Sequence, residues 1–226
     1  MITVAGILIG LVFIVESYVW YVRTMAAPAY RSKSISTSNM VMYITRVLII
    51  GYQIILNFTI ESGGGLRSVL IATLIGIVVS LFGHAILFYN KKVLGGSWRF
   101  FTYTLTRLRI IKVHEYEKVV YFPVRNIGFS YLALASALST IALVFVYIAP
   151  QIFATLYSNY RLTLSSIGQV ISFFGMVITL FVLDPALFKM HDAGEIQKGF
   201  SVYLQGRMVG LIVAIILLLT CLIQFT

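Results

Sequence analysis

Cysteine and charge are both scarce in this sequence. Cys221 is the only cysteine among 226 residues, so the chain can form no intramolecular disulfide and no thiolate metal cage. Charged residues make up 11% of the chain and hydrophobic residues 60%, far from the proportions of soluble domains. These two shortages exclude disulfide redox chemistry and a water-soluble fold.

Acidic residues are especially few, with seven against seventeen lysines and arginines and a formal net charge of +10. Such a balance favours anionic partners. In a chain this apolar, anionic phospholipids at the inner leaflet explain the basic residues more simply than nucleic acid does. We therefore expect phospholipid contacts and no nucleic acid.

Two motifs that would indicate an enzyme are incomplete. Gly63-Gly64-Gly65 is followed by Leu66-Arg67 and lacks the Lys-Ser/Thr of a phosphate-binding loop, so it predicts a short turn. His114-Glu115 begins like a zinc-protease helix, but Lys118 stands where the second histidine ligand is required. The sequence predicts no catalytic residue, no metal and no cofactor.

Long apolar runs dominate what is present. A helix needs about 20 apolar residues to cross about 30 Å of hydrocarbon. Six segments qualify, namely residues 2–22, 38–60, 66–88, 127–148, 164–183 and 200–225. The prediction is an all-α, polytopic integral membrane protein in which residues 1–226 form one six-helix transmembrane domain. A three-plus-three inverted repeat, with residues 89–125 as the connector, stays open.

The positions of the basic residues predict the orientation. Thirteen of the seventeen lysines and arginines lie in the first, third and fifth connections, whereas the second and fourth hold only Arg67 and Arg161. Cytoplasmic loops retain positive charge. We therefore expect a bacterial cytoplasmic membrane protein with both termini on the extracytoplasmic side.

The third connection, residues 89–125, is the only long one. Its apolar side chains recur at helical spacing, and arginines occupy the other faces; these apolar residues are Leu94, Trp98, Phe101, Leu105 and Leu108. The pattern predicts a basic amphipathic helix lying on the inner leaflet. A simple surface tether is one interpretation, and a gate or a guide for anionic lipids is another.

The second predicted span carries polar residues along one face. Asn39, Tyr43, Arg46, Gln53 and Asn57 follow one another at steps of 4, 3, 7 and 4, which places all five on one side of a helix. Polar side chains facing lipid are costly. The face therefore predicts a polar environment inside the membrane.

Five ionisable residues are expected in the inner half of the bundle: Glu16, Arg46, His84, Asp184 and Arg207. A hydrated cavity open to the cytoplasm would explain them together. Structural alternatives exist for each. The arginines can snorkel to headgroups, Glu16 can be the partner of Arg46, Asp184 can end a helix before Pro185, and His84 can be a hydrogen-bonded packing residue.

The two arginines predict the chemistry of the bound molecule. Guanidinium groups hold phosphate oxygens bidentately and stay charged, so Arg46 and Arg207 suit a diphosphate. Asn39, Gln53, Tyr43 and Gln205 are candidates for further substrate contacts. Glu16 and Asp184, with His84, would balance charge or couple transport to protons.

Four short motifs occur in order along the chain: Arg46 after the serine-rich stretch 34–38, Asn159-Tyr160-Arg161 with Thr163, Leu180-Phe181-Val182-Leu183-Asp184-Pro185, and Leu204-Gln205-Gly206-Arg207-Met208-Val209-Gly210. Together they resemble motifs of the Amj family of lipid II flippases. The resemblance implies six spans and a flippase for lipid II or a related undecaprenyl-linked precursor of the cell wall. Alternatives are a membrane-embedded lipid transferase or phosphatase, and a non-catalytic subunit of an envelope complex. The sequence also leaves open whether the chain forms an oligomer.

Overall fold

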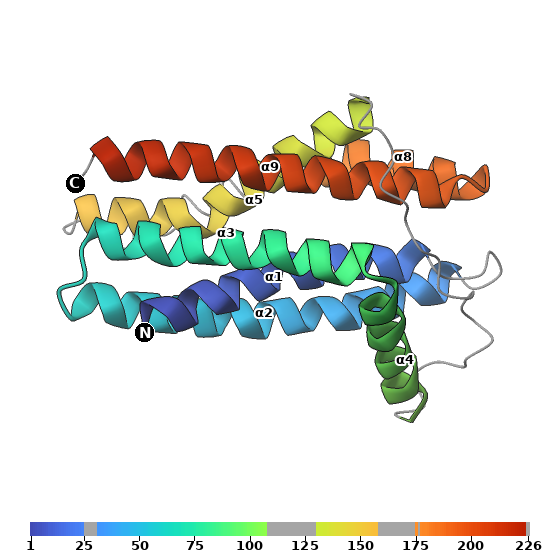
Figure 1. Cartoon of the computed structure of the whole chain (residues 1–226), viewed down its shortest axis with the longest axis horizontal. Coiled ribbons are helices and arrows are strands. Elements are labelled where there is room, and N and C mark those ends of the chain that lie inside the picture. Colours follow the sequence, from blue (N-terminus) through green and yellow to red (C-terminus); the bar gives the residue numbers. More distant parts are fainter. Residues whose placement is uncertain (25–30, 108–129, 158–174, 176, 225–226) are drawn as a thin grey trace.

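The computed structural model describes residues 1–24, 31–107, 130–157, 175 and 177–224. Within these residues every regular element is helical (Figure 1). The elements are α1 (Ile2–Thr24), α2 (Arg31–Glu61), α3 (Leu66–Tyr89), α4 (Lys91–Arg107), α5 (Tyr131–Leu156), the π-helical turn η4 (Thr179–Leu183), α8 (Asp184–Asp192) and α9 (Ile196–Gln224).

Five of these helices are long and apolar enough to cross a membrane: Ile2–Arg23, Ile35–Glu61, Leu66–Tyr89, Tyr131–Leu156 and Lys198–Gln224. The chain is therefore a helical membrane protein, as its composition predicts. The remaining predicted span, residues 164–183, falls mostly outside the described residues.

Helix bounds differ from the predicted spans where polar residues continue a helix. α2 begins at Arg31 rather than at Ser38, and α5 ends at Leu156 although Pro150 lies inside it. Hydropathy marks only the part of a helix that suits hydrocarbon, whereas backbone hydrogen bonds continue into the interface. Between α2 and α3 the glycine-rich segment is the expected turn, with Gly63 at φ 92°.

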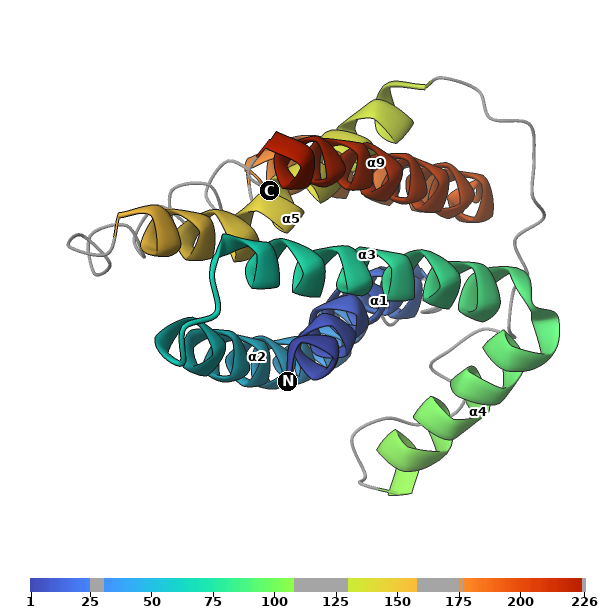
Figure 2. The same cartoon turned by 60° about the vertical axis from the view of Figure 1, so that its left-hand side comes forward.

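The helices form two groups. α1 packs against both α2 and α3, and α5 packs against α9, which also contacts α8. Figure 2 shows α3 between the two groups, and α3 contacts both α5 and α9. An inverted repeat relating the groups stays a prediction.

Small residues allow the backbones to approach closely within the first group. A Cβ at Gly6 would lie 2.7 Å from the carbonyl oxygen of Ala72, and one at Gly10 would lie 2.7 Å from that of Gly76. Close approach of this kind is the usual role of a GxxxG pair in membranes.

In the second group, glycines likewise allow the helix backbones to approach closely. A Cβ at Gly210 on α9 would lie 2.6 Å from the carbonyl oxygen of Ala137 on α5, and Gly206 approaches Ala133 similarly. Arg207 lies between these glycines in the sequence. Its position relative to α5 is therefore fixed by tight backbone packing.

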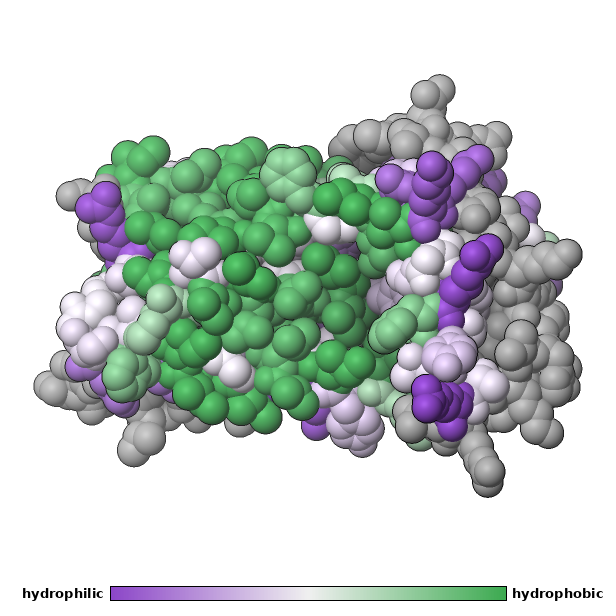
Figure 3. Space-filling view, turned by 60° about the horizontal axis from the view of Figure 1, so that its bottom comes forward, coloured by the Kyte–Doolittle hydropathy of each residue, from purple (hydrophilic) through white to green (hydrophobic). Residues whose placement is uncertain are grey.

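Apolar side chains cover the middle of the face that Figure 3 shows. Hydrophilic residues gather toward the two ends of this face. Val47, Phe82 and Ile223 are among the most exposed side chains, at 69%, 66% and 77%. This apolar surface matches the one expected of a protein surrounded by lipid.

α4 runs across the long axis of the other helices (Figure 1). Its apolar stripe packs on the protein, and its place on the inner leaflet stays a prediction. Leu94 and Trp98 are buried in a cluster that contains Tyr21, and Phe101 and Leu105 pack against that cluster. The apolar spacing therefore serves protein packing, because the end of the bundle offers an aromatic surface; Leu108 lies outside the described residues.

Candidate functional site

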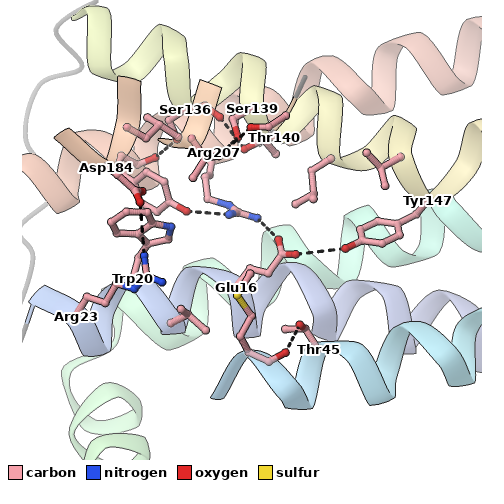
Figure 4. Close-up of a pocket in the computed structure, with 18 of the residues that line it drawn as sticks. Glu16, Trp20, Arg23, Thr45, Ser136, Ser139, Thr140, Tyr147, Asp184 and Arg207 are labelled. Carbon is pink, nitrogen blue, oxygen red and sulfur yellow. Dashed lines mark hydrogen bonds and ion pairs between the residues drawn. The ribbon is translucent and has the colours of Figure 1, made fainter. Parts of the chain in front are cut away.

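A cavity of about 410 Å³ lies between the two groups of helices (Figure 4). α1 and α2 line one side, and α5, η4, α8 and α9 line the other. Its charged residues are three arginines and two carboxylates: Arg23, Arg46, Arg207, Glu16 and Asp184. The cavity therefore gathers four of the nine residues that the sequence predicts for the site, and adds Arg23.

Glu16 and Arg207 form a buried ion pair across the cavity. Nη2 of Arg207 lies 3.2 Å from Oε2 of Glu16, and the two side chains are 7% and 11% exposed. Nη1 of Arg207 donates to the hydroxyl of Tyr203 at 2.8 Å, and the hydroxyl of Tyr147 donates to Glu16 at 3.4 Å. The terminal nitrogens of Arg207 are therefore both partnered, and within the described residues its Nε is buried without a partner.

A second ion pair joins α1 to α8. Nη1 of Arg23 lies 3.9 Å from Oδ2 of Asp184, Nε of Arg23 donates to Ser38 at 2.8 Å, and its guanidinium lies 4.8 Å from the Trp20 ring centroid. Burial raises the pKa of the Asp184 carboxyl, and Arg23 opposes that rise. Oδ1 of Asp184 is buried without a hydrogen-bond partner among the described residues.

Arg23 is the charged cavity-lining residue that sequence reasoning misses. It ends an apolar segment and is assigned to a cytoplasmic connection. Its position seven residues after Glu16 is the available signal, since that step returns to the same helix face. Both residues in fact line the cavity from α1.

Arg46 lines the same cavity but is exposed. Its guanidinium lies 5.7 Å from the ring centroid of Tyr43. Among the described residues it has no acidic partner. Glu16, its expected partner, pairs with Arg207 instead, because equal depth on two helices does not decide which side chain each one faces.

Hydroxyl groups make up another part of the wall. Ser136, Ser139 and Thr140 on α5 line the cavity with Thr45 and Thr179. Ser139 and Thr179 lie within hydrogen-bond distance of each other, at 3.2 Å. The three α5 residues follow one another at steps of 3 and 1, which places them on one side of the helix. Their spacing in the sequence is thus a signal of a polar face on α5.

Comparison of the chain with protein-family models, curated proteins and solved structures finds no match. The resemblance to lipid II flippases therefore stays a prediction.

The other predicted substrate contacts lie away from the cavity wall. Asn39, Tyr43 and Gln53 are on the exposed face of α2, where Asn39 accepts a hydrogen bond from Arg23 at 3.3 Å. Gln205 is buried at 8% exposure on α9. Helical spacing correctly groups the α2 residues on one face, but it does not show whether that face points inward.

His84 is packed between α1 and α3, outside the cavity. Its Nε2 lies 2.6 Å from Ser17 Oγ and its Nδ1 lies 2.7 Å from the Ser80 carbonyl oxygen. The side chain is 1% exposed. This environment matches the packing interpretation of His84.

The cavity is suited to binding a polar or anionic group within the membrane. The part of the chain that the structure describes holds no group of three His, Cys, Asp or Glu side chains arranged for a metal. The polar groups that line the cavity are guanidinium donors, hydroxyls and carboxylates. Such groups recognise phosphates and sugar hydroxyls by hydrogen bonding.

Proposed function

We propose that the chain is a transporter that moves a polyprenyl-diphosphate sugar lipid, such as lipid II or a related envelope precursor, from one leaflet to the other. One observation carries the proposal. The cavity between the helix groups contains three arginines and only two carboxylates. Its net positive charge calls for an anion, because an unbalanced charge inside a membrane is costly.

Arg46 supplies the unbalanced charge. Arg23 and Arg207 each have a carboxylate partner, whereas Arg46 has none among the described residues. A phosphate group would give Arg46 a bidentate, charge-assisted partner. Arg46 is therefore the first contact that we assign to the headgroup.

The arginines that are paired with carboxylates would bind the diphosphate after it has entered the cavity. A diphosphate that reaches Arg207 competes with Glu16 for the same guanidinium nitrogens. The pair can then open without leaving Arg207 alone, since the phosphate replaces the carboxylate. Glu16 in this scheme keeps the empty cavity balanced and releases Arg207 to the substrate.

The cavity volume suits a headgroup rather than a whole lipid. Ligand sites are commonly about 300–1,000 Å³, and this one is about 410 Å³. A diphosphate with a sugar ring fits that range, whereas a polyprenyl tail does not. The tail would remain in the surrounding bilayer.

Purified protein in vesicles provides the test. A fluorescent polyprenyl-diphosphate disaccharide is added to the vesicles, and the fraction reached by an impermeant quencher is followed over time. We expect faster exchange between leaflets than in protein-free vesicles and in vesicles that carry Arg46→Gln. Equal rates in all three would contradict the proposal.

Two further readouts separate the alternatives. Mass spectrometry of the recovered lipid shows an altered molecule if the protein is a transferase or phosphatase, and an unchanged one if it is a transporter. Expression in cells depleted of their lipid II flippases tests the substrate. Rescue supports lipid II, and failure of a well-expressed chain leaves other sugar lipids as the cargo.

A further inference from the structure

The polar face of α2 points out of the bundle. Asn39, Tyr43, Arg46, Gln53 and Asn57 are all exposed, and Tyr43 is 65% exposed. Within the described residues, Gln53 and Asn57 make no hydrogen bond. A face of this kind needs water or a polar ligand beside it, because hydrocarbon forms no hydrogen bonds with donors or acceptors.

This face is continuous with the cavity. Arg46 belongs to both. Met42, Thr45 and Ile49, on the neighbouring side of α2, line the cavity but do not belong to the polar face. α2 packs mainly on α1 and only slightly on α3. Arg46 therefore joins the cavity to a polar face that continues along the exposed side of α2.

The face is long enough to matter for transport. Asn39 and Asn57 are eighteen residues apart, which corresponds to about 27 Å along a helix. The hydrocarbon core is about 30 Å thick. Polar side chains therefore accompany almost the whole crossing.

We infer that the polar face of α2 is a hydrated track along which an anionic lipid headgroup crosses the membrane while its tail stays in the bilayer. The inference rests on the proposed function and specifies the route that the headgroup takes. The headgroup binds at Arg46 beside the cavity and then passes Gln53 and Asn57. Both amides offer donors to phosphate and acceptors to sugar hydroxyls.

A neighbouring strip of α2 suits the tail. Val47, Ile54 and Phe58 are 69%, 64% and 59% exposed, and each lies within four residues of a polar-face residue. A lipid on the track would place its polar end against the amides and its tail against this strip. The two strips together match the amphiphilic character of the cargo.

A second copy of the chain fits the face less well. Two copies in one membrane are usually related by a two-fold axis along its normal, which brings residues of equal depth together. Arg46 would then face the Arg46 of the partner in a medium that screens charge poorly. A lipid phosphate gives the same side chain an opposite charge.

Single-cysteine variants test the track. In a Cys221→Ser background, Gln53→Cys and Asn57→Cys report on the polar face, and Ile54→Cys and Phe58→Cys are matched controls on the same helix. Thiols react as thiolates, which form in water and not in hydrocarbon. We expect a charged thiol reagent to modify the first pair at least about tenfold faster than the controls.

Other outcomes overturn the inference. Equally slow modification of all four variants would mean that the face is dry. Spontaneous disulfide-linked dimers of Gln53→Cys or Asn57→Cys, without reagent labelling, would show that a second copy covers the face. Thermal unfolding of each variant identifies any that is misfolded.

Transport by the double variant Gln53→Leu/Asn57→Leu separates this inference from the proposed function. We expect transport at least about tenfold slower than in the parent, because the amides are the polar contacts of the outer half. Ile54→Leu is the control and should transport like the parent. Parent-like transport by the double variant overturns the track and leaves the function standing, whereas a parent that moves no lipid removes both.

Discussion

Glu16 and Arg207 meet 3.2 Å apart although 191 positions separate them in the sequence. The pair joins α1 in one helix group to α9 in the other and crosses the cavity between them (Figure 4). Any anion that binds Arg207 must compete with this carboxylate. The ion pair thus links occupancy of the cavity to the contact between the groups.

Glu16→Leu should destabilise the protein. The substitution leaves the buried guanidinium of Arg207 without its carboxylate, and removal of one partner from a buried pair costs about 3–5 kcal/mol. We expect a clearly lower Tm in detergent. Thermal unfolding of the purified variant measures the change.

The double variant Glu16→Leu/Arg207→Met is the matched control. With both charges removed, no buried ion lacks a partner, and stability should return to within about 1 kcal/mol of the parent. Transport should nevertheless be lost, since Arg207 is absent. A double variant as unstable as Glu16→Leu would contradict the role given to the pair.

Arg46→Gln should affect transport and not stability. Because Arg46 has no acidic partner among the described residues, its removal should change the free energy of unfolding by less than about 0.5 kcal/mol. A charge-assisted hydrogen bond is worth about 1.5–3 kcal/mol, so transport should slow by about tenfold or more. The vesicle assay and a thermal melt check both parts.

Arg67→Gln is the control for Arg46. Arg67 is an exposed arginine in the first turn of α3 and does not line the cavity. Its removal takes away the same charge, so transport should be unchanged. Equal slowing by the two substitutions would point to the overall charge instead of a site at Arg46.

Gly10→Ala should loosen the contact between α1 and α3. The new Cβ would lie 2.7 Å from the carbonyl oxygen of Gly76, and overpacking of this kind costs about 1–3 kcal/mol. Gly96→Ala on α4 is the control, since no atom lies within 4 Å of its Cβ position. That change should stabilise by about 0.5–1 kcal/mol. Melting temperatures that move in the same direction would contradict the packing argument.

His84→Gln should leave the transport rate unchanged. A glutamine amide can keep a hydrogen bond to Ser17, and His84 lies outside the cavity lining. Losing the second bond, to the Ser80 carbonyl, should lower stability by about 1 kcal/mol. A folded His84→Gln protein without transport would restore the alternative in which this histidine carries a proton.

The sequence predicts the helices well because their signals are local. Runs of apolar residues fix which segments can cross lipid, and the spacing on α2 correctly places its polar residues on one face. The amphipathic spacing of α4 likewise predicts a helix. What that helix contacts is not local information, so the spacing alone does not show that Leu94 and Trp98 are buried in the protein.

By itself the sequence determined a helical membrane protein with charged residues in its spans, since hydropathy and helical periodicity depend only on neighbouring residues. The tertiary structure decided that Glu16 pairs with Arg207, that Arg23 lines the cavity with Asp184, and that the polar face of α2 points outward. Those outcomes depend on how each helix is rotated against its neighbours. Rotation is set by close packing at small residues such as Gly10 and Gly210, and the charges then pair with whatever that packing brings within reach.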